Sequence, residues 1–185
     1  MKSKGLIIVI IVIAVLLLGF GGIYNSLVKK DIAVTAAWSQ VENVLQRRAD
    51  LIPNLVSSVK GYVKHERAVL DNLAKARAEY TGAKSFDEKT KAAGMMEGAL
   101  SRLLVIVENY PNLKANETFS RLMDELSGTE NRIAVERKRY NEAVQDLNTS
   151  IKRFPQNFVA SIFGFKSKPF FESEENAKTV PKVNF

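Results

Sequence analysis

The sequence of 185 residues contains no cysteine and a single histidine, His65, which is expected at a helix surface. Without cysteine there is no disulfide framework, thiolate zinc site, iron–sulfur cluster or cysteine nucleophile. One histidine is too few for the two Glu-x-x-His pairs of a di-iron bundle. Phosphate-binding Gly-x-x-x-x-Gly-Lys-Ser/Thr loops and Gly-x-Ser-x-Gly nucleophile elbows are also missing from the sequence. We therefore expect no catalytic residues, no metal, no cofactor and no small-molecule substrate; an enzyme of unknown type is the less favoured alternative.

Charge of one sign is only in modest excess. The 27 lysine and arginine residues outnumber the 20 aspartate and glutamate residues, for a net charge of +7. Four of the lysines, Lys2, Lys4, Lys29 and Lys30, flank a single apolar run, whereas the acidic and basic residues after Ile32 are mixed. This distribution favours contact with a bilayer and indicates no nucleic-acid partner.

The run between these lysines has no charged residue. Its most apolar part, Gly5–Ile23, would be about 28 Å long as a helix, close to the roughly 30 Å hydrocarbon layer of a bilayer. We expect a short flank at residues 1–4 and a transmembrane anchor at residues 5–27. A cleaved signal peptide is the alternative, although its apolar region is usually only about 7–15 residues long. Because both ends of the run are basic, the positive-inside rule does not decide the orientation.

Beyond the anchor, apolar residues recur with the spacing of helices, and no alternating strand pattern interrupts them. Two seams with a heptad period run through residues 34–80. One seam contains Val34, Val41, Leu55, Tyr62, Val69 and Ala76, and the other contains Trp38, Leu45, Ile52, Val59, Leu73 and Tyr80. The sequence predicts an all-α fold, in which the transmembrane helix precedes an antiparallel bundle of three to four long helices over residues 28–171.

The predicted bundle helices have unequal lengths. The first, over residues 33–82, should be kinked near Pro53, because proline removes a backbone hydrogen bond and clashes with the preceding turn. The second should begin with the capping box formed by Ser85 and Glu88. The third should begin near Asn116, and its division at Gly128 is an alternative way to match the lengths.

Four charged residues occupy seam positions in this pattern. Arg48 and Glu66 lie on the first helix, and Glu130 and Arg137 lie on the third. A charge in a bundle core must be paired, because its desolvation costs several kcal/mol. One interpretation is that opposite charges meet across the two helices and set their register. The other is that the helices rotate locally and these side chains reach water.

The carboxyl-terminal part of the bundle is rich in phenylalanine. Phe154 is assigned to the seam of the third helix, and five more rings follow: Phe158, Phe163, Phe165, Phe170 and Phe171. These rings either pack back onto the bundle and cap its end or form a patch, interleaved with lysines, that binds lipid or a partner. One or two helical turns are expected around Asn157–Phe163. Residues 172–185 are polar and are expected to form a disordered tail.

Several unbroken motifs are typical of one family. They are the runs AWSQVEN at 37–43, QRRADLIPNL at 46–55, YPNLKAN at 110–116 and ENRI at 130–133. With these motifs the sequence resembles the bacterial LemA family over nearly the whole stretch from Tyr24 to Glu172. The resemblance implies an inner-membrane protein with one amino-terminal span and a helical bundle in the cytoplasm. It implies no catalytic residues.

The first motifs are unusually polar for bundle seams, and part of this run is a candidate interaction surface. Its members are Gln40, Glu42, Asn43, Arg47, Asp50 and Asn54. The favoured hypothesis is a non-enzymatic, membrane-anchored scaffold or adaptor that binds another membrane protein or a second copy of itself. The alternative is a membrane-remodelling or lipid-surface-binding protein that uses the aromatic patch.

Overall fold

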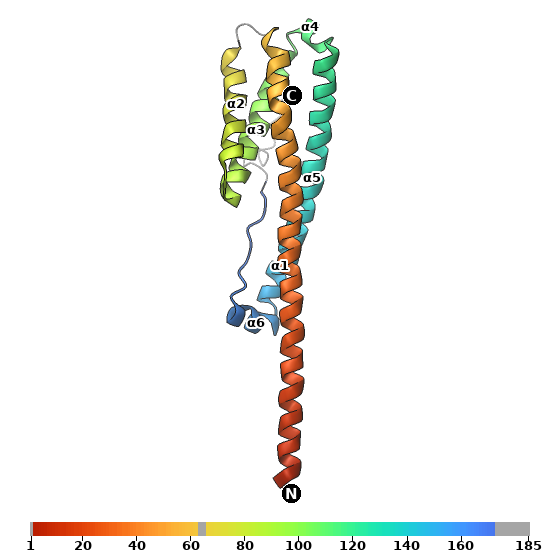
Figure 1. Cartoon of the computed structure of the whole chain (residues 1–185), viewed down its shortest axis with the longest axis vertical. Helices are drawn as coiled ribbons and strands as arrows, with labels where there is room; N and C mark the ends of the chain where they lie inside the picture. The colour runs from red at the N-terminus through yellow and green to blue at the C-terminus, as the bar shows by residue number, and fades with distance from the viewer. Residues whose placement is uncertain (1, 63–65, 173–185) are drawn as a thin grey trace, which may run out of the picture. The chain divides into compact units, whose positions relative to one another are not determined.

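The computed structural model describes residues 2–62 and 66–172. Within these ranges every regular element is a helix (Figure 1), which confirms the predicted all-α fold. The helices are α1 (Lys2–Lys60), α2 (Arg67–Gly82), α3 (Phe86–Val107), α4 (Pro111–Lys114), α5 (Glu117–Lys152) and α6 (Gln156–Phe163). The predictions for His65 and for a tail after Glu172 lie outside the described residues.

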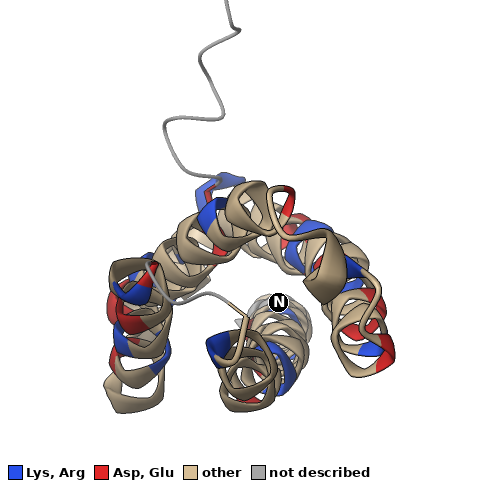
Figure 2. Ribbon diagram, turned by 90° about the horizontal axis from the view of Figure 1, so that it is seen from above, with Lys and Arg blue, Asp and Glu red and all other residues tan. Residues whose placement is uncertain are grey.

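The chain divides into two compact units. The anchor unit comprises residues 1–39 and 138–170, and the bundle unit comprises residues 40–137 and 171–185, described as far as Glu172. Helices α1 and α5 contribute residues to both units. Acidic and basic residues are interspersed along the helices, as Figure 2 shows.

The bundle unit is an antiparallel bundle, as predicted. The phenol of Tyr80 in α2 donates to the Glu42 carbonyl of α1 at 3.4 Å, and the Arg77 side chain donates to the Ala49 carbonyl at 3.1 Å. Since residue numbers rise along one helix as they fall along the other, α2 runs opposite to α1. The fully buried core includes Val41, Leu45, Ile52, Leu55, Leu73, Met96 and Leu103.

In the anchor unit, α5 also runs antiparallel to α1. The Lys30 ammonium lies 2.7 Å from the Asp146 carboxylate, and the rings of Trp38 and Tyr140 are 5.5 Å apart. Helix α6 packs onto α1 through a small core of Leu27, Val159 and Ala160, with Ile23, Ile151 and Phe165 around it. The predicted short helix near Asn157–Phe163 is confirmed as α6.

The apolar part of α1 is exposed at its described residues from Gly5 to Gly22. Ile8, Val15 and Leu18 are among its exposed residues. The helix is long and apolar enough to cross a membrane. Because a core helix of a water-soluble bundle would be buried by its neighbours, this exposure fits a membrane anchor.

The predicted length of the first bundle helix is wrong. One helix was expected over residues 33–82, but α1 ends at Lys60 and α2 begins at Arg67. Pro53 lies inside α1, which continues past it for two further turns. The heptad pattern did not reveal the reversal, because Leu73 and Tyr80 of α2 are buried just as they would be on a continuous seam.

The other predicted boundaries agree better with the structure. The capping box at Ser85 is formed, with the Glu88 amide donating to the Ser85 hydroxyl and the Glu88 carboxylate accepting from the Ser85 amide. The Asn116 side chain accepts from the Phe119 amide at 3.0 Å and starts α5, which passes Gly128 undivided. Phe154 does not lie on the seam; it follows the end of α5 and is exposed.

Candidate functional site

Arg48 is a buried charge in the bundle unit, with only 3% of its surface exposed. It lies on α1, and its guanidinium forms an ion pair with the Glu130 carboxylate of α5. Its Nε also donates to the Thr129 hydroxyl at 3.3 Å, and this hydroxyl donates to the Leu126 carbonyl at 2.7 Å. Both partners come from one turn of α5, so a single charged residue of α1 is held by neighbouring groups of α5.

The other two charged seam residues have different surroundings. Glu66 immediately precedes α2 and is half-buried, and its backbone carbonyl accepts from the Val69 amide. The Arg137 guanidinium lies over the ring of Phe171, 5.1 Å from its centroid, in a cation–π contact. Among the described ion pairs of the chain, none joins Glu66 to Arg137, so of the expected cross-helix pairs Arg48–Glu130 is the one seen.

The polar run on α1 is divided between two faces. Glu42 points toward α3, where its carboxylate pairs with Lys89, and it is half-buried. The remaining members are exposed and recur at intervals of three and four residues, which places them on one helix face. We call this exposed face the α1 stripe; it consists of Gln40, Asn43, Arg47, Asp50 and Asn54.

Two members of the α1 stripe make contacts of their own. The Arg47 guanidinium lies 3.4 Å from the Glu125 carboxylate, and Gln46 donates to the Asp50 carboxylate at 2.8 Å. These contacts are solvent-exposed, so each stabilises the fold little. The residues of the α1 stripe remain exposed despite these contacts.

The five phenylalanines of the expected patch do not form one exposed surface. Phe158 and Phe163 of α6 are exposed, whereas Phe165 packs against the core around Leu27. Phe171 is buried in the bundle unit, where its ring lies 6.5 Å from that of Phe86. Phe170 is partly exposed. Both sequence interpretations therefore describe part of this segment: some rings cap a core, and others remain uncovered.

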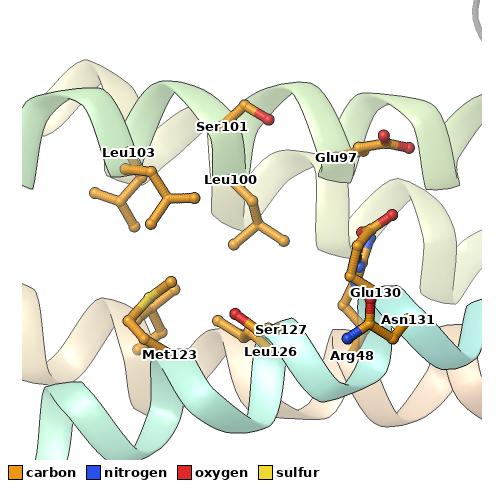
Figure 3. Close-up of a pocket in the computed structure, with 12 residues that line it drawn as sticks. Arg48, Glu97, Leu100, Ser101, Leu103, Met123, Leu126, Ser127, Glu130 and Asn131 are labelled. Carbon is orange, nitrogen blue, oxygen red and sulfur yellow. Dashed lines mark hydrogen bonds and ion pairs between the residues drawn. The ribbon is translucent and has the colours of Figure 1, made fainter.

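A pocket of about 310 Å³ lies in the bundle unit between α3 and α5. Figure 3 shows Leu100 and Leu103 of α3 facing Met123 and Leu126 of α5 across it. At one end the walls become polar, with Glu97, Glu130 and Asn131 near Arg48. We call this pocket the α3/α5 groove.

A second, smaller pocket adjoins the charged end of the α3/α5 groove. It shares Arg48 and Glu97 with the groove, and it is also lined by Gly94, Arg137 and Phe171. The sequence did not indicate either pocket, because Glu97, Ser101 and Asn131 look like ordinary solvent-facing residues of amphipathic helices. These residues line a pocket only because α3 and α5 are spaced apart in the folded bundle unit.

The α3/α5 groove combines apolar and polar lining residues. Half of its lining residues are leucine or methionine, and its charged groups are Arg48, which pairs with Glu130, and Glu97. Among the described residues, no cluster of histidine, aspartate and glutamate side chains could hold a metal ion. The groove can therefore accept an apolar surface that carries a polar group at one end.

Comparison with known proteins identifies relatives in bacteria. The magnetosome protein MamQ 2 of Paramagnetospirillum magneticum is 27% identical over 182 residues, covering 84% of this chain and 67% of the relative. MamQ of Magnetospirillum gryphiswaldense is 26% identical over the same coverage. Protein LemA of Metamycoplasma hominis is 24% identical over 170 residues, covering 90% of this chain and 76% of the relative. The LemA family model matches residues 37–185, and the chain therefore belongs to the LemA family.

Proposed function

We propose that the protein is a non-enzymatic scaffold, held in the bacterial inner membrane by a single retained span, whose bundle unit binds another membrane protein or a second copy of the chain. The magnetosome association named for the MamQ relatives supports a membrane setting. Retention of the span is supported by the continuity of α1, since the same helix carries the apolar run and the core residues Val41 and Ile52. By family resemblance the bundle faces the cytoplasm.

The α3/α5 groove is the observation that carries this proposal. A groove between two helices that has leucines on one side and Met123 and Leu126 on the other suits the apolar face of an amphipathic helix. Leu104 lies at its edge and is substantially exposed, so an apolar surface is open to a partner. The charged end near Arg48 and Glu130 would orient the partner through polar contacts.

The α1 stripe provides a second, polar contact surface. Its residues are exposed in the bundle unit, although the fold itself requires only the inward-facing residues of α1, such as Leu45 and Ile52. Polar contacts of this kind contribute specificity more than affinity. We assign the groove as the main binding surface and the stripe as a secondary one.

Site-specific photo-crosslinking in native membranes tests the proposal. A photoreactive residue is placed at Ser101 in the α3/α5 groove, and a matched one at the exposed Asp71 on α2 as a control. Crosslinking to one defined species from Ser101, and not from Asp71, is the expected result. A species of twice the chain mass identifies a second copy, and a heavier or lighter one identifies another protein.

A blocking substitution makes the result specific for the groove. Leu104→Glu places a charge at the groove edge and should abolish the crosslink from Ser101. Val105→Glu is the matched control, because Val105 is the neighbouring exposed residue on α3 and does not line the groove. Equal crosslinking from Ser101 in both variants, or equal crosslinking from Ser101 and Asp71, contradicts the proposal.

A further inference from the structure

Helix α6 leaves large apolar side chains uncovered in the anchor unit. The exposed fractions are 62% for Phe158, 64% for Ile162 and 57% for Phe163, and Phe154 just before the helix is 79% exposed. Two other residues of α6, Val159 and Ala160, are buried in the small core with Leu27. A helix that keeps large apolar side chains exposed beside such a core is not suited to water on that surface.

This uncovered surface lies beside the end of the apolar run of α1. The ring of Tyr24, the residue that follows this run, is 4.7 Å from the ring of Phe163 and 6.0 Å from the ring of Phe165. Ile23 and Leu27 also pack against the core that contains α6. If the run Gly5–Ile23 spans the hydrocarbon layer, α6 lies at the level of the headgroups, where aromatic side chains are enriched.

The charges around α6 are mainly basic. The segments 24–31 and 146–170 contain six basic residues and two acidic ones. The two acidic residues are matched within the unit: Asp146 lies 2.7 Å from the Lys30 ammonium, and Asp31 lies 3.1 Å from the Lys168 ammonium. The remaining basic residues, Lys29, Lys152, Arg153 and Lys166, complement acidic phospholipid headgroups.

We propose that these side chains form an interfacial platform that lies in the headgroup region of the leaflet from which α1 leaves the membrane. The platform consists of Phe154, Phe158, Ile162 and Phe163. Its occupant is the lipid bilayer, because Phe163 contacts Tyr24 at the end of the proposed span and the segments 24–31 and 146–170 are mainly basic. The inference rests on the proposed anchoring by α1. In function, the platform fixes the depth of the span and the height at which the rest of α1 leaves the bilayer.

The absence of cysteine makes the test direct, because each engineered cysteine is the only one in the full chain. The variants Phe158→Cys and Ile162→Cys carry an environment-sensitive fluorophore in the platform. Ser161→Cys is the matched control, since Ser161 is an exposed polar residue on the same helix. Glu142→Cys on α5 is a second control, and Val15→Cys reports the span itself. Each protein is reconstituted into vesicles of phosphatidylcholine with or without phosphatidylglycerol.

Quenching by lipids with a nitroxide at the headgroup, and by aqueous iodide, places each label. We expect labels at 158 and 162 to be quenched several-fold more by the nitroxide lipid than labels at 161 and 142, with the difference largest in phosphatidylglycerol vesicles. Iodide should show the reverse order. Circular dichroism confirms that each labelled protein keeps its helix content.

Three outcomes overturn the inference, and they separate it from the proposed anchoring. If positions 158 and 162 are quenched by iodide as strongly as position 161, the platform lies in water. If they are shielded from both quenchers, protein covers them instead of lipid. In both cases, quenching of the label at position 15 by a third probe, a lipid with a nitroxide deep in its acyl chain, shows that the anchoring stands. If position 15 is itself open to iodide, the anchoring and the platform both fail.

Discussion

Arg48 and Glu130 join α1 to α5 through an ion pair whose two sides differ in burial. The Arg48 side chain is 4% exposed, whereas the Glu130 side chain is 48% exposed. The arginine therefore depends on its partner, because removal of one member leaves an uncompensated charge in the core. The Glu130 carboxylate is hydrated whether or not it is paired with Arg48. Glu130 therefore lies between the buried guanidinium and solvent, at the charged end of the α3/α5 groove.

The pair predicts an unequal effect for two neighbouring carboxylates of α5. Glu130→Ala should destabilise the protein by about 1–3 kcal/mol, because it removes the ion pair of the buried guanidinium and, of its two described hydrogen bonds, leaves the one to the Thr129 hydroxyl. Glu125→Ala removes the exposed partner of Arg47 and should cost less than about 1 kcal/mol. Denaturant unfolding of the full chain in detergent, followed by circular dichroism, measures both. Equal losses would show that the buried arginine does not need Glu130.

A double replacement tests whether the charge or the packing matters at this site. Arg48→Met in the Glu130→Ala background removes the buried charge and keeps a flexible apolar side chain in its place. Part of the stability lost in Glu130→Ala should return, since no uncompensated charge is left in the core. The comparison uses the same unfolding experiment. Further destabilisation of the double variant would show that the Arg48 side chain contributes mainly through its own contacts.

Core packing predicts a contrast between two leucines of the bundle unit. Leu73 of α2 is fully buried, so Leu73→Ala should cost about 2–5 kcal/mol through lost burial and the cavity left behind. Leu104 of α3 is partly exposed at the groove edge, so Leu104→Ala should cost about 1 kcal/mol or less. The measurement is the midpoint of denaturant unfolding, compared between variants whose free energy of unfolding has the same slope against denaturant concentration. A larger loss at Leu104 would contradict the open groove.

Alkaline pH should weaken the bundle through Tyr80. Burial raises the pKa of Tyr80 from 10.0 to about 12, and the nearby carboxylates Glu42 and Asp50 add to this effect. Below pH 10 the phenol is neutral in both the folded and the unfolded state. Between about pH 10 and 12 the unfolded state loses its proton first, so stability falls as the pH rises. The unfolding midpoint should therefore fall less in Tyr80→Phe than in the unaltered protein.

Burial also raises the pKa of Tyr140, in the anchor unit, to about 12. Tyr80→Phe should therefore still lose some stability at alkaline pH. This loss of stability should decrease further when Tyr140→Phe is added. An identical pH dependence in the unaltered protein and the double variant would contradict this origin of the effect. The two hydroxyls donate hydrogen bonds to the Glu42 and Pro169 carbonyls, and the variants lose these bonds at every pH. The stability of each variant at pH 7 is therefore the reference for its change at alkaline pH.

Acid should weaken the start of α3 through Glu88. The backbone amides of Lys84 and Ser85 donate to its carboxylate at 2.8 and 3.1 Å and hold its pKa below the ordinary value of 4.5. Since the folded pKa is depressed, the stabilisation is present above the ordinary value and is lost as the pH falls through the folded pKa. Glu88→Gln should therefore lose less stability than the unaltered protein on acidification. Equal losses would contradict a specific role of the carboxylate.

The sequence determined the local properties of this protein, because these depend on residues close together in the chain. The all-α class and the buried seam residues Leu45, Ile52 and Leu73 follow from helical periodicity, and the start of α3 follows from the side chain of Ser85 three residues before Glu88. Membership of the LemA family also followed from the contiguous polar motifs. The apolar run indicated the anchor by its length alone.

The tertiary structure decided which helix faces which. The reversal after Lys60 was hidden, because α2 folds back onto α1 with its seam still buried. Arg48–Glu130 and Glu66–Arg137 were both possible pairs across the two helices, and only the approach of α5 to α1 selected Arg48–Glu130. The same is true of the phenylalanines, of which Phe171 is buried and Phe158 is uncovered. Such contacts join residues far apart in the chain, and their geometry depends on the turns and on the packing of whole helices, which no short stretch of sequence specifies.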